Sequence, residues 1–522
     1  MFDLRPADAQ LLSAHATGEQ PVGAIGRAPA VSPRWRTVIV VCAWLVILAA
    51  LIGVRLCLIE KLPFYLWSKD GGSYADSAWQ WLDTGIWETD PRRGAVYSLL
   101  IGFCLKTWGT FWSLMLVQHG LVAGSVLLAI VVLWRLGGTR AWLPLTACSV
   151  AYALYAGPIA AAHIVRNESL ILLFATVCLS AWFAAVRTNA SVWVGLAGLA
   201  FGWLVLTKNV FAPLPLLILA AIFLLNRSRP LQAAQRAAVF VGACALPLIG
   251  DHILRERTLH DRPVEPQAGL LLFARVAQFT RLDSGIHREL KALIREDIEA
   301  YRRRPKLDNN IILNRTAVPR LRAHLLSIGQ TPSDLNRICR QLAFEAIRTH
   351  PREYARQFWK DFVKLHISYG ERLKRPDRGE FEFTTRWLSQ MERPHPTLHR
   401  AETLSAIQAR DRPETFRMYE RLVDGAWLFN CSPVLLTSLI LPVMTLLSRV
   451  PVRWWWLALC TVWYFNMVLL CTVGKPMDRY LIPVMPVMFW TLGAATVFIF
   501  ETIVRFVRPR LGYASLSPHP AP

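Results

Sequence analysis

Five short segments of this chain place ionisable side chains beside long apolar runs. The first contains Asp70, in the sequence Trp67-Ser-Lys-Asp70-Gly-Gly-Ser-Tyr74, just after the first apolar run. A carboxylate in that place, followed by flexible glycines and then an interfacial helix, is positioned to meet a substrate that a lipid carries. The alternative is that Asp70 caps the helix or remains a solvated loop acid.

The second segment contains paired arginines in the sequence Asp90-Pro-Arg92-Arg93-Gly-Ala-Val-Tyr97. Two guanidinium groups at a membrane surface can hold phosphate oxygens through parallel N–H groups. Arg92 and Arg93 can equally be interfacial residues that bury their stems and keep their charges in water. The residues alone leave both roles open.

Two further segments interrupt apolar sequence with charge. The turn His163-Ile-Val-Arg-Asn-Glu168 precedes an apolar run, and Glu168 is expected in the first turn of that helix, where the helix dipole favours a carboxylate. Lys208 stands alone between two apolar runs. A lone cation there indicates a functional site with an anionic ligand, although Lys208 can also simply mark the end of a hairpin.

The last segment is a charged turn that leads into an apolar run with two prolines, Pro483 and Pro486. It contains Lys475, Arg479 and Tyr480. Arg479 and Tyr480 at the mouth of a helix can bind a phosphate group. The two prolines weaken the backbone hydrogen bonding of the span, and such irregular backbone often borders a cavity.

The composition indicates which solvent surrounds these segments. Of 522 residues, 54% are hydrophobic and 18% are charged, which is too apolar for a soluble enzyme of this length. The net charge is +22, but the basic residues cluster beside apolar runs, where anionic lipid head groups and topology signals account for them. This pattern argues against nucleic-acid binding, which needs a continuous basic face.

The apolar runs predict an all-α polytopic membrane protein. Crossing a bilayer takes about 20 apolar residues, and by that measure the chain has about ten transmembrane helices. Interfacial helices and a mainly helical extracytoplasmic domain accompany them. The predicted spans are 37–58, 111–134, 141–157, 168–186, 191–207, 209–226, 234–251, 426–448, 453–474 and 480–502.

The same pattern divides the chain into five parts. These are a cytoplasmic tail at 1–36, a transmembrane catalytic region at 37–251 with about seven spans and an outer segment at 59–110, an extracytoplasmic domain at 252–425, a transmembrane region at 426–502 with about three spans, and a cytoplasmic tail at 503–522. The basic residues of the short loops place both termini inside and all five motifs outside.

Local patterns predict individual elements within these parts. Residues 73–87 are expected to form an interfacial helix with Tyr74 and Ala78 on one face. Residues 333–349 and 351–368 are expected to be helices of the extracytoplasmic domain. The runs on either side of Lys208 are expected to form a tight hairpin.

Several common motifs are missing from the sequence. It contains no phosphate-binding loop of nucleotide hydrolases, no dinucleotide fingerprint, no HExxH and no paired CxxC. These absences argue against a nucleotide-driven pump. The ten cysteines lie mostly in apolar runs and imply no disulfide framework.

The five segments together resemble membrane glycosyltransferases of the GT-C class, in particular bacterial relatives of protein O-mannosyltransferases and the lipid A aminoarabinose transferase. The resemblance covers roughly residues 60–250 and 470–490. The first element is an acid followed by Tyr four residues later and Ala eight residues later, here Asp70 to Ala78, and the second is an Arg-x-x-x-Tyr element, here Arg93 to Tyr97. The third is an acid that opens a span, here Glu168, and the fourth is a Thr-Lys hairpin, here Thr207-Lys208. The fifth is an Arg-Tyr-Leu-x-Pro-x-x-Pro signature, here Arg479 to Pro486. The sequence departs from the family at Gly71, where many members have a second acid, and beside Tyr97, where a proline is often found.

The resemblance implies a reaction and a set of site residues. A sugar passes from a polyprenyl-phosphate donor to a hydroxyl of a glycan, lipid or protein acceptor at the periplasmic face of a bacterial inner membrane, with inversion at the anomeric carbon. Asp70 is the implied general base, and Arg93, Lys208 and Arg479 are implied to bind the donor phosphate. The residues implied to surround the substrates are Tyr74, Arg92, Tyr97, His163, Glu168, Lys475 and Tyr480. No cofactor is required; a divalent metal is compatible with the site but not indicated.

Two other functions fit a multi-pass membrane protein. A transporter or flippase of polyprenyl-linked sugars is expected to have charged or helix-breaking positions near the midplane and repeated halves. The apolar runs here hold almost no mid-span charge, which favours chemistry at the membrane surface. A scaffold subunit that binds partners through residues 252–425 is the remaining alternative.

Overall fold

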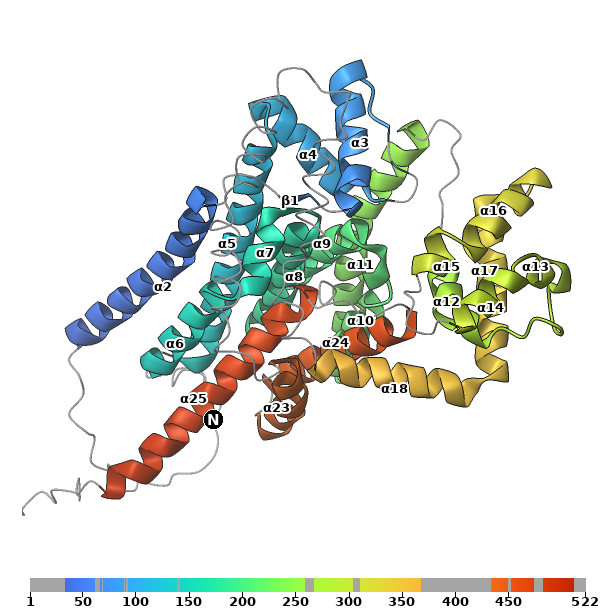
Figure 1. Ribbon diagram of the computed structural model, residues 1–522. Helices are drawn as coiled ribbons and strands as arrows, with labels where there is room; N and C mark the ends of the chain where they lie inside the picture. The colour runs from blue at the N-terminus through green and yellow to red at the C-terminus, as the bar shows by residue number, and fades with distance from the viewer. Residues whose placement is uncertain are drawn as a thin grey trace, which may run out of the picture.

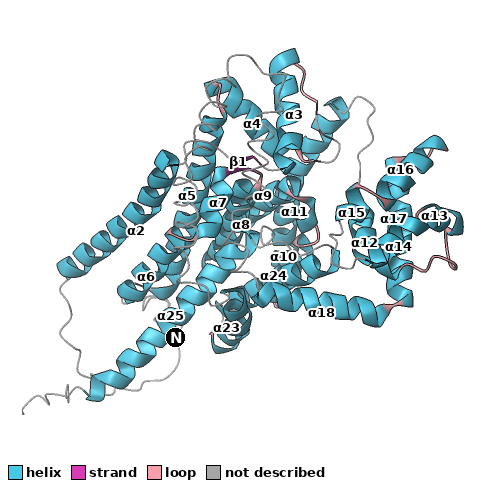
Figure 2. Cartoon of the chain, in the orientation of Figure 1, coloured by secondary structure: helices cyan, strands magenta, loops and turns pink. Residues whose placement is uncertain are grey.

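The computed structural model describes residues 33–61, 66–67, 69–88, 90, 93–138, 141–258, 267–303, 310–367, 433–448, 452–473 and 482–510. These residues are almost entirely helical, with one short two-stranded sheet (Figures 1 and 2). Up to residue 258 the helices are α2 (Pro33–Lys61), α3 (Lys69–Thr84), α4 (Ala95–Trp108), α5 (Phe111–Gly137), α6 (Trp142–Ala153), α7 (Ala156–His163), α8 (Glu168–Thr188), α9 (Ser191–Thr207), α10 (Pro215–Leu225) and α11 (Pro230–Thr258).

Within these ranges, six helices are long and apolar enough to cross a membrane. They comprise Thr37–Glu60, Phe111–Gly137, Glu168–Thr188, Pro230–Thr258, Arg453–Thr472 and Ile482–Val504. Shorter apolar helices, among them α9 and α23 (Pro433–Leu447), accompany them. The prediction of a helical multi-pass membrane protein is therefore confirmed.

One predicted span is broken. The run 141–157 forms α6 and α7, which are separated at Leu154 and Tyr155. The cause is Pro158, whose nitrogen has no hydrogen to donate to the carbonyl of Leu154 and whose ring would clash with that carbonyl. A new helix can begin there, because proline is tolerated in a first turn.

The predicted tight hairpin at Lys208 is not formed. After α9 the chain passes through a short 3-10 helix, Asn209–Phe211, and α10 begins only at Pro215. α9 packs on α8 and α11, whereas α10 packs on α11 and α24 (Val452–Val473). Pro213 and Pro215 lack backbone donors, which delays the start of α10.

Glycines allow α9 and α11 to approach closely. A Cβ atom at Gly198 would lie 2.3 Å from the Phe240 carbonyl oxygen, and one at Gly202 would lie 2.4 Å from that of Cys244. The two glycines are four residues apart and therefore share one face of α9. This small-xxx-small pattern is typical of helix contacts in membranes, where close backbone packing replaces the hydrophobic effect.

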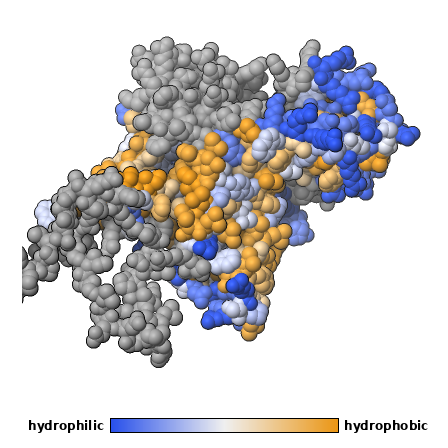
Figure 3. All heavy atoms as spheres, turned by 90° about the horizontal axis from the view of Figure 1, so that it is seen from below, coloured by the Kyte–Doolittle hydropathy of each residue, from blue (hydrophilic) through white to orange (hydrophobic). Residues whose placement is uncertain are grey.

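The described residues 267–303 and 310–349 form a helical subdomain with a hydrophobic core of its own. Its helices are α12 (Ala268–Val276), α13 (Arg288–Leu293), α14 (Arg295–Arg303), α15 (Asn310–Asn314), α16 (Ala317–Ser327) and α17 (Pro332–Thr349). In Figure 3 its surface is mostly hydrophilic, whereas apolar side chains gather over the centre of the molecule. The helix predicted at 333–349 is confirmed as α17, and its Leu335, Ile338, Leu342 and Ala346 are buried as expected.

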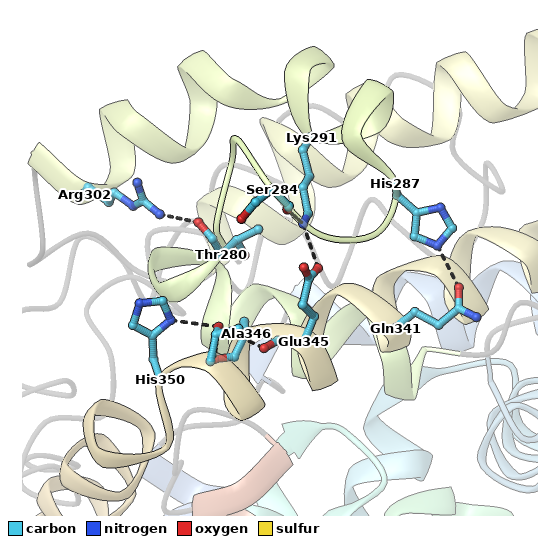
Figure 4. A network of polar contacts seen from close by, with 10 residues as sticks. Thr280, Ser284, His287, Lys291, Arg302, Gln341, Glu345, Ala346 and His350 are labelled. Atoms are coloured by element: carbon cyan, nitrogen blue, oxygen red, sulfur yellow. Dashed lines mark hydrogen bonds and ion pairs between the residues drawn. The ribbon is translucent and has the colours of Figure 1, made fainter.

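Polar contacts hold the subdomain together (Figure 4). The buried ammonium group of Lys291 donates to Glu345 at 2.7 Å and to the Ser284 carbonyl at 2.6 Å. At the start of α17, Thr331 and Asp334 form a capping box. Hydrogen bonds from the Thr331 hydroxyl and backbone N–H hold the pKa of Asp334 below its ordinary value, because they favour the charged carboxylate.

The second predicted helix of this region leaves the subdomain. It is α18 (Pro351–Ile367), which begins at the expected proline and lies along α23 and α24. At the junction the Arg275 guanidinium forms an ion pair with Asp361 and donates to the Cys471 carbonyl of α24 at 3.0 Å. The Tyr354 hydroxyl donates to the Thr472 carbonyl at 3.1 Å. The subdomain is thus attached to a transmembrane helix, and the sidedness and limits of 252–425 stay predictions.

Candidate functional site

A two-stranded parallel sheet joins the first and third motif segments. β1 (Leu66–Trp67) pairs with β2 (Ile164–Val165), with Leu66 opposite Ile164 and Trp67 opposite Val165. Asp70 follows β1 by three residues and Glu168 follows β2 by three residues. Both acids therefore stand in the first turns of helices, α3 and α8, that leave the same end of the sheet. The side chain of Asp70 lies outside what the structure describes.

The predicted interfacial helix is confirmed as α3, which begins four residues earlier than expected, at Lys69. Tyr74 and Ala78 are buried, whereas Asp76 and Asp83 are exposed. The glycines after Asp70, predicted to be flexible, are helical. Because α3 already begins at Lys69, the backbone of Asp70 belongs to a regular helix that packs on α4.

Arg93 lies over the ring of Tyr74, with its guanidinium carbon 5.1 Å from the ring centroid. The Tyr74 ring meets the ring of Tyr97 edge-on at 5.1 Å. The Arg93 carbonyl accepts a hydrogen bond of 2.7 Å from Arg255, which is held in turn by Asp251 at 2.5 Å. α11 makes these contacts because it extends past residue 251, where its predicted span ends. A cation above an aromatic ring keeps a defined orientation, so Arg93 is held from two sides.

Gln118 connects three elements in the interior. The Tyr97 hydroxyl donates to Gln118 Oε1 at 2.7 Å, and Gln118 Nε2 donates to the carbonyls of Ala162 and Ile164, each at 3.1 Å. The neighbouring His119 contacts His163, with 3.2 Å between His119 Nε2 and His163 Nδ1. Gln118, His119 and His163 are all buried. The network places His163 next to β2 and Tyr97 near the sheet.

The sequence neighbours of Glu168 and Lys208 meet at the end of α9. Asn167 donates to the Thr207 carbonyl at 2.6 Å, which holds the start of α8 beside Lys208. Glu168 is only 3% exposed, and within the described residues its Oε2 has no hydrogen-bond partner. A Cβ atom at Gly94 would lie 2.0 Å from the Leu206 carbonyl oxygen, so the chain after Arg93 also passes against this end of α9.

The structure thus gathers the described parts of four of the five motifs. The segments of Asp70 to Ala78, Arg93 to Tyr97, Glu168 and Thr207-Lys208 lie together, although they are spread over more than a hundred residues of sequence. Arg92, Lys475, Arg479 and Tyr480 lie outside the described residues. In the part of the chain that is described, no three His, Cys, Asp or Glu side chains are grouped as metal ligands.

No protein-family model and no curated protein sequence matches the chain. Two crystal structures are similar to it. One is ArnT from Cupriavidus metallidurans bound to undecaprenyl phosphate, with 16% identity, a TM-score of 0.33 and coverage of 89% of this chain and 79% of that one. The other is the same protein in the apo state, with 14% identity, a TM-score of 0.33 and coverage of 90% and 78%.

Four polar residues near the site were missed by sequence reasoning: Gln118, His119, Asp251 and Arg255. The signal for the first two was present, since they are adjacent polar residues inside the apolar run 111–134. Asp251 and Arg255 are spaced i, i+4 at the end of an apolar run, a spacing that brings two side chains to one helix face. Nothing in that spacing indicates that the pair contacts Arg93.

Proposed function

We propose that this chain is a membrane glycosyltransferase that moves a sugar from a polyprenyl-phosphate donor to an acceptor hydroxyl, with inversion. The observation that supports it most is the pairing of β1 with β2, because it brings the backbone positions of two acidic motif residues, Asp70 and Glu168, to one end of the small sheet. Arg93 and Lys208 stand at the same end. Carboxylates and cations in one place are what such a transfer needs.

In the proposed reaction the acceptor oxygen attacks the anomeric carbon while Asp70 takes the proton of the acceptor hydroxyl. The bond between the anomeric carbon and the carrier phosphate breaks in the same step, and the phosphate leaves with the electron pair. Arg93, Lys208 and Arg479 stabilise the charge that develops on the phosphate, and each contribution is enlarged where water is scarce. No covalent intermediate is needed, since the phosphate is already a good leaving group.

The remaining site residues have supporting roles in this proposal. Tyr74 and Tyr97 orient Arg93 and contact the substrates. His163 and Glu168, which flank β2 in the sequence, contact the substrates as well, together with Arg92, Lys475 and Tyr480. The reaction takes place at the periplasmic face of a bacterial inner membrane, with both termini in the cytoplasm. The acceptor is a glycan, a lipid or a protein.

One observation favours a second candidate, a transporter of polyprenyl-linked sugars. Arg55 is buried inside the first apolar helix, at 4% exposure, which qualifies the expectation that the spans hold almost no charge. Ionisable groups within transmembrane helices often mark substrate pathways. A transporter would move the donor without breaking its glycosidic bond, so an assay of bond cleavage separates the two functions.

The test is transfer of radiolabelled sugar from a panel of synthetic polyprenyl-phosphate sugars by the purified protein, together with a membrane extract that supplies acceptors. We expect Asp70→Asn to lower the transfer rate by about 100-fold or more, since general bases contribute 10² to 10⁴-fold. Donor binding should be retained.

The matched control is Asp76→Asn, which removes an exposed carboxylate from the same helix. We expect its transfer rate to stay within about twofold of wild type, as for most surface substitutions. Equal transfer by wild type and Asp70→Asn would refute Asp70 as the base. Transport of the intact donor into vesicles, with no transfer to any acceptor, would favour the transporter.

A further inference from the structure

Arg55 is an arginine inside a membrane-spanning helix. It lies in α2, where the side chains of Leu45 and Leu56 are 60% and 61% exposed. The side chain of Arg55, by contrast, is only 4% exposed. Arg55 therefore points toward the protein and not toward lipid. A buried guanidinium in a span costs stability unless a partner compensates for its charge, so such a residue indicates a functional site by default.

The hydrogen bonds of Arg55 leave one edge of the guanidinium open. Nη1 donates to the Leu51 carbonyl at 2.8 Å. Nε and Nη2 are buried, and among the described residues neither has a hydrogen-bond partner. The N–H groups of Nε and Nη2 are parallel, and this edge is the one that binds two oxygens of a phosphate or carboxylate group at once.

Two further polar groups near Arg55 lack partners in the same way. α2 packs on both α5 and α6, and the charge of Arg55 acts on Tyr152 of α6 and on His119 of α5. The Tyr152 hydroxyl and His119 Nδ1 are buried without a hydrogen-bond partner within the described part of the chain. Tyr152 and His119 are themselves 5% and 3% exposed. Three helices thus contribute polar atoms that lack partners to one buried region.

The contact between the two histidines determines what His119 can offer. Because His119 Nε2 and His163 Nδ1 are 3.2 Å apart, one nitrogen donates and the other accepts. When His163 donates, neutral His119 carries its proton on Nδ1. Arg55 and His119 then present donors only, and the Tyr152 hydroxyl has a hydrogen to donate as well. Buried donors without acceptors are costly, so a bound oxyanion would stabilise this region.

The number of donors favours one kind of anion. The Nε and Nη2 groups of Arg55 can donate to two oxygens, and Tyr152 and His119 add further donors. A carboxylate has two oxygens in one plane, whereas a phosphate monoester has three terminal oxygens in a tetrahedral arrangement. A sugar-linked carrier phosphate is a diester with only two terminal oxygens, so the carrier regains its third terminal oxygen when the sugar leaves.

We propose that Arg55, Tyr152 and the His119–His163 pair bind the phosphate monoester of a membrane lipid. If the chain is the proposed transferase, this lipid is the polyprenyl phosphate that is released after sugar transfer; this assignment rests on the proposed function. The two sites are linked through the structure, since His119 is adjacent to Gln118, which binds Tyr97, and His163 directly precedes β2. Arg55 thereby gains a role that is separate from the phosphate-binding residues of the transfer step.

The test is binding of farnesyl phosphate to the full-length protein in nanodiscs of phosphatidylcholine, measured by tryptophan fluorescence without sugar donor or acceptor. We expect Arg55→Gln to weaken binding by about tenfold or more, and Tyr152→Phe by a few-fold, as the loss of charged and neutral hydrogen bonds predicts. Arg55→Lys should lie between wild type and Arg55→Gln, because it keeps the charge but not the two-pronged edge. The matched control, Arg187→Gln at the exposed end of α8, should bind as wild type does.

Farnesol and inorganic phosphate separate the sources of the affinity. We expect farnesol to bind at least about tenfold more weakly than farnesyl phosphate, and inorganic phosphate to compete only at much higher concentration. Equal binding of farnesol, or unchanged binding by Arg55→Gln and Tyr152→Phe, would overturn the proposal. Inorganic phosphate that binds as tightly as farnesyl phosphate would overturn the assignment to a lipid. Tyr152→Phe removes a single oxygen atom, so it tests the site even if Arg55→Gln does not fold.

The same measurements distinguish this site from the transferase itself. Weakened binding in the variants, combined with no sugar transfer by the wild type, would support the phosphate site and refute the transfer function. Sugar transfer by the wild type, combined with unchanged phosphate binding in all variants, would refute the site and leave the transferase intact.

Discussion

Glu168 combines a favourable place with an unfavourable environment. It lies in the first turn of α8, where the helix dipole stabilises a carboxylate. It is nevertheless buried, and among the described residues its Oε2 accepts no hydrogen bond. A side chain that served only to cap the helix would be more stable with a hydrogen-bond partner. A carboxylate oxygen that is buried without a partner costs stability, so its presence indicates a residue that is retained for binding.

At this scale we predict the outcome of Glu168→Gln. The amide removes a buried charge, so the midpoint of thermal unfolding should stay the same or rise by a few degrees. Sugar transfer should fall by about tenfold or more, because a hydrogen bond to a charged carboxylate contributes about 1.5–3 kcal/mol. Tryptophan fluorescence and the transfer assay measure the two effects. The control is Glu256→Gln, on the exposed surface of α11, which should change neither the unfolding midpoint nor the transfer rate. A lower midpoint with unchanged transfer in Glu168→Gln would show that Glu168 has only a structural role.

The position of Lys208 depends on how a whole helix packs. α9 ends at Thr207, and the face that carries Gly198 and Gly202 lies against the backbone of α11. The same α11 holds Arg93 through Arg255. Because α9 and α11 position two cations of the candidate site, a change in their separation would move both cations relative to the Glu168 carboxylate.

We therefore predict that Gly198→Ala and Gly202→Ala each destabilise the protein by about 1–3 kcal/mol, the usual cost of overpacking. The added methyl group would meet a backbone carbonyl, which cannot move away as a side chain can. Thermal unfolding and monodispersity in detergent are the measurements. Gly195→Ala is the control, because its Cβ would meet only Val239 at 3.4 Å, an ordinary contact. Equal effects at Gly195 and Gly198 would contradict the close-packing argument.

On the scale of the whole molecule, two of the three hydrophobic cores of the described residues are joined at a small polar junction. The helical subdomain has its own core, and the transmembrane helices share another. Between them, buried Arg275 pairs with Asp361 and donates to the Cys471 carbonyl. An ion pair at such a place costs desolvation, so it fixes the geometry of the junction more than it adds to stability.

We predict that Asp361→Asn destabilises this junction by about 3–5 kcal/mol, because Arg275 would remain buried without a counter-charge. The double variant Arg275→Met/Asp361→Leu should recover most of that loss. Limited proteolysis of the subdomain and thermal unfolding test both. Asp283→Asn breaks the exposed pair with Arg295 and should cost less than about 1 kcal/mol. A double variant as unstable as Asp361→Asn would contradict the explanation.

Local composition determined much of this protein, because hydropathy and helix-start signals act over a few residues. It was enough to predict the six long apolar helices of the described residues and also α3, α17 and α18, although ten spans were expected. The break at Pro158 and the open turn at Lys208 also have local causes, namely prolines. A prediction from the length of apolar runs alone does not take these prolines into account. Tertiary structure decided the rest. The pairing of β1 with β2, the contacts of Gln118 with Tyr97 and of Arg255 with Arg93, and the inward direction of Arg55 depend on how each helix is rotated against distant neighbours. That rotation follows from packing across the whole bundle, and no short segment of sequence contains the information that determines it.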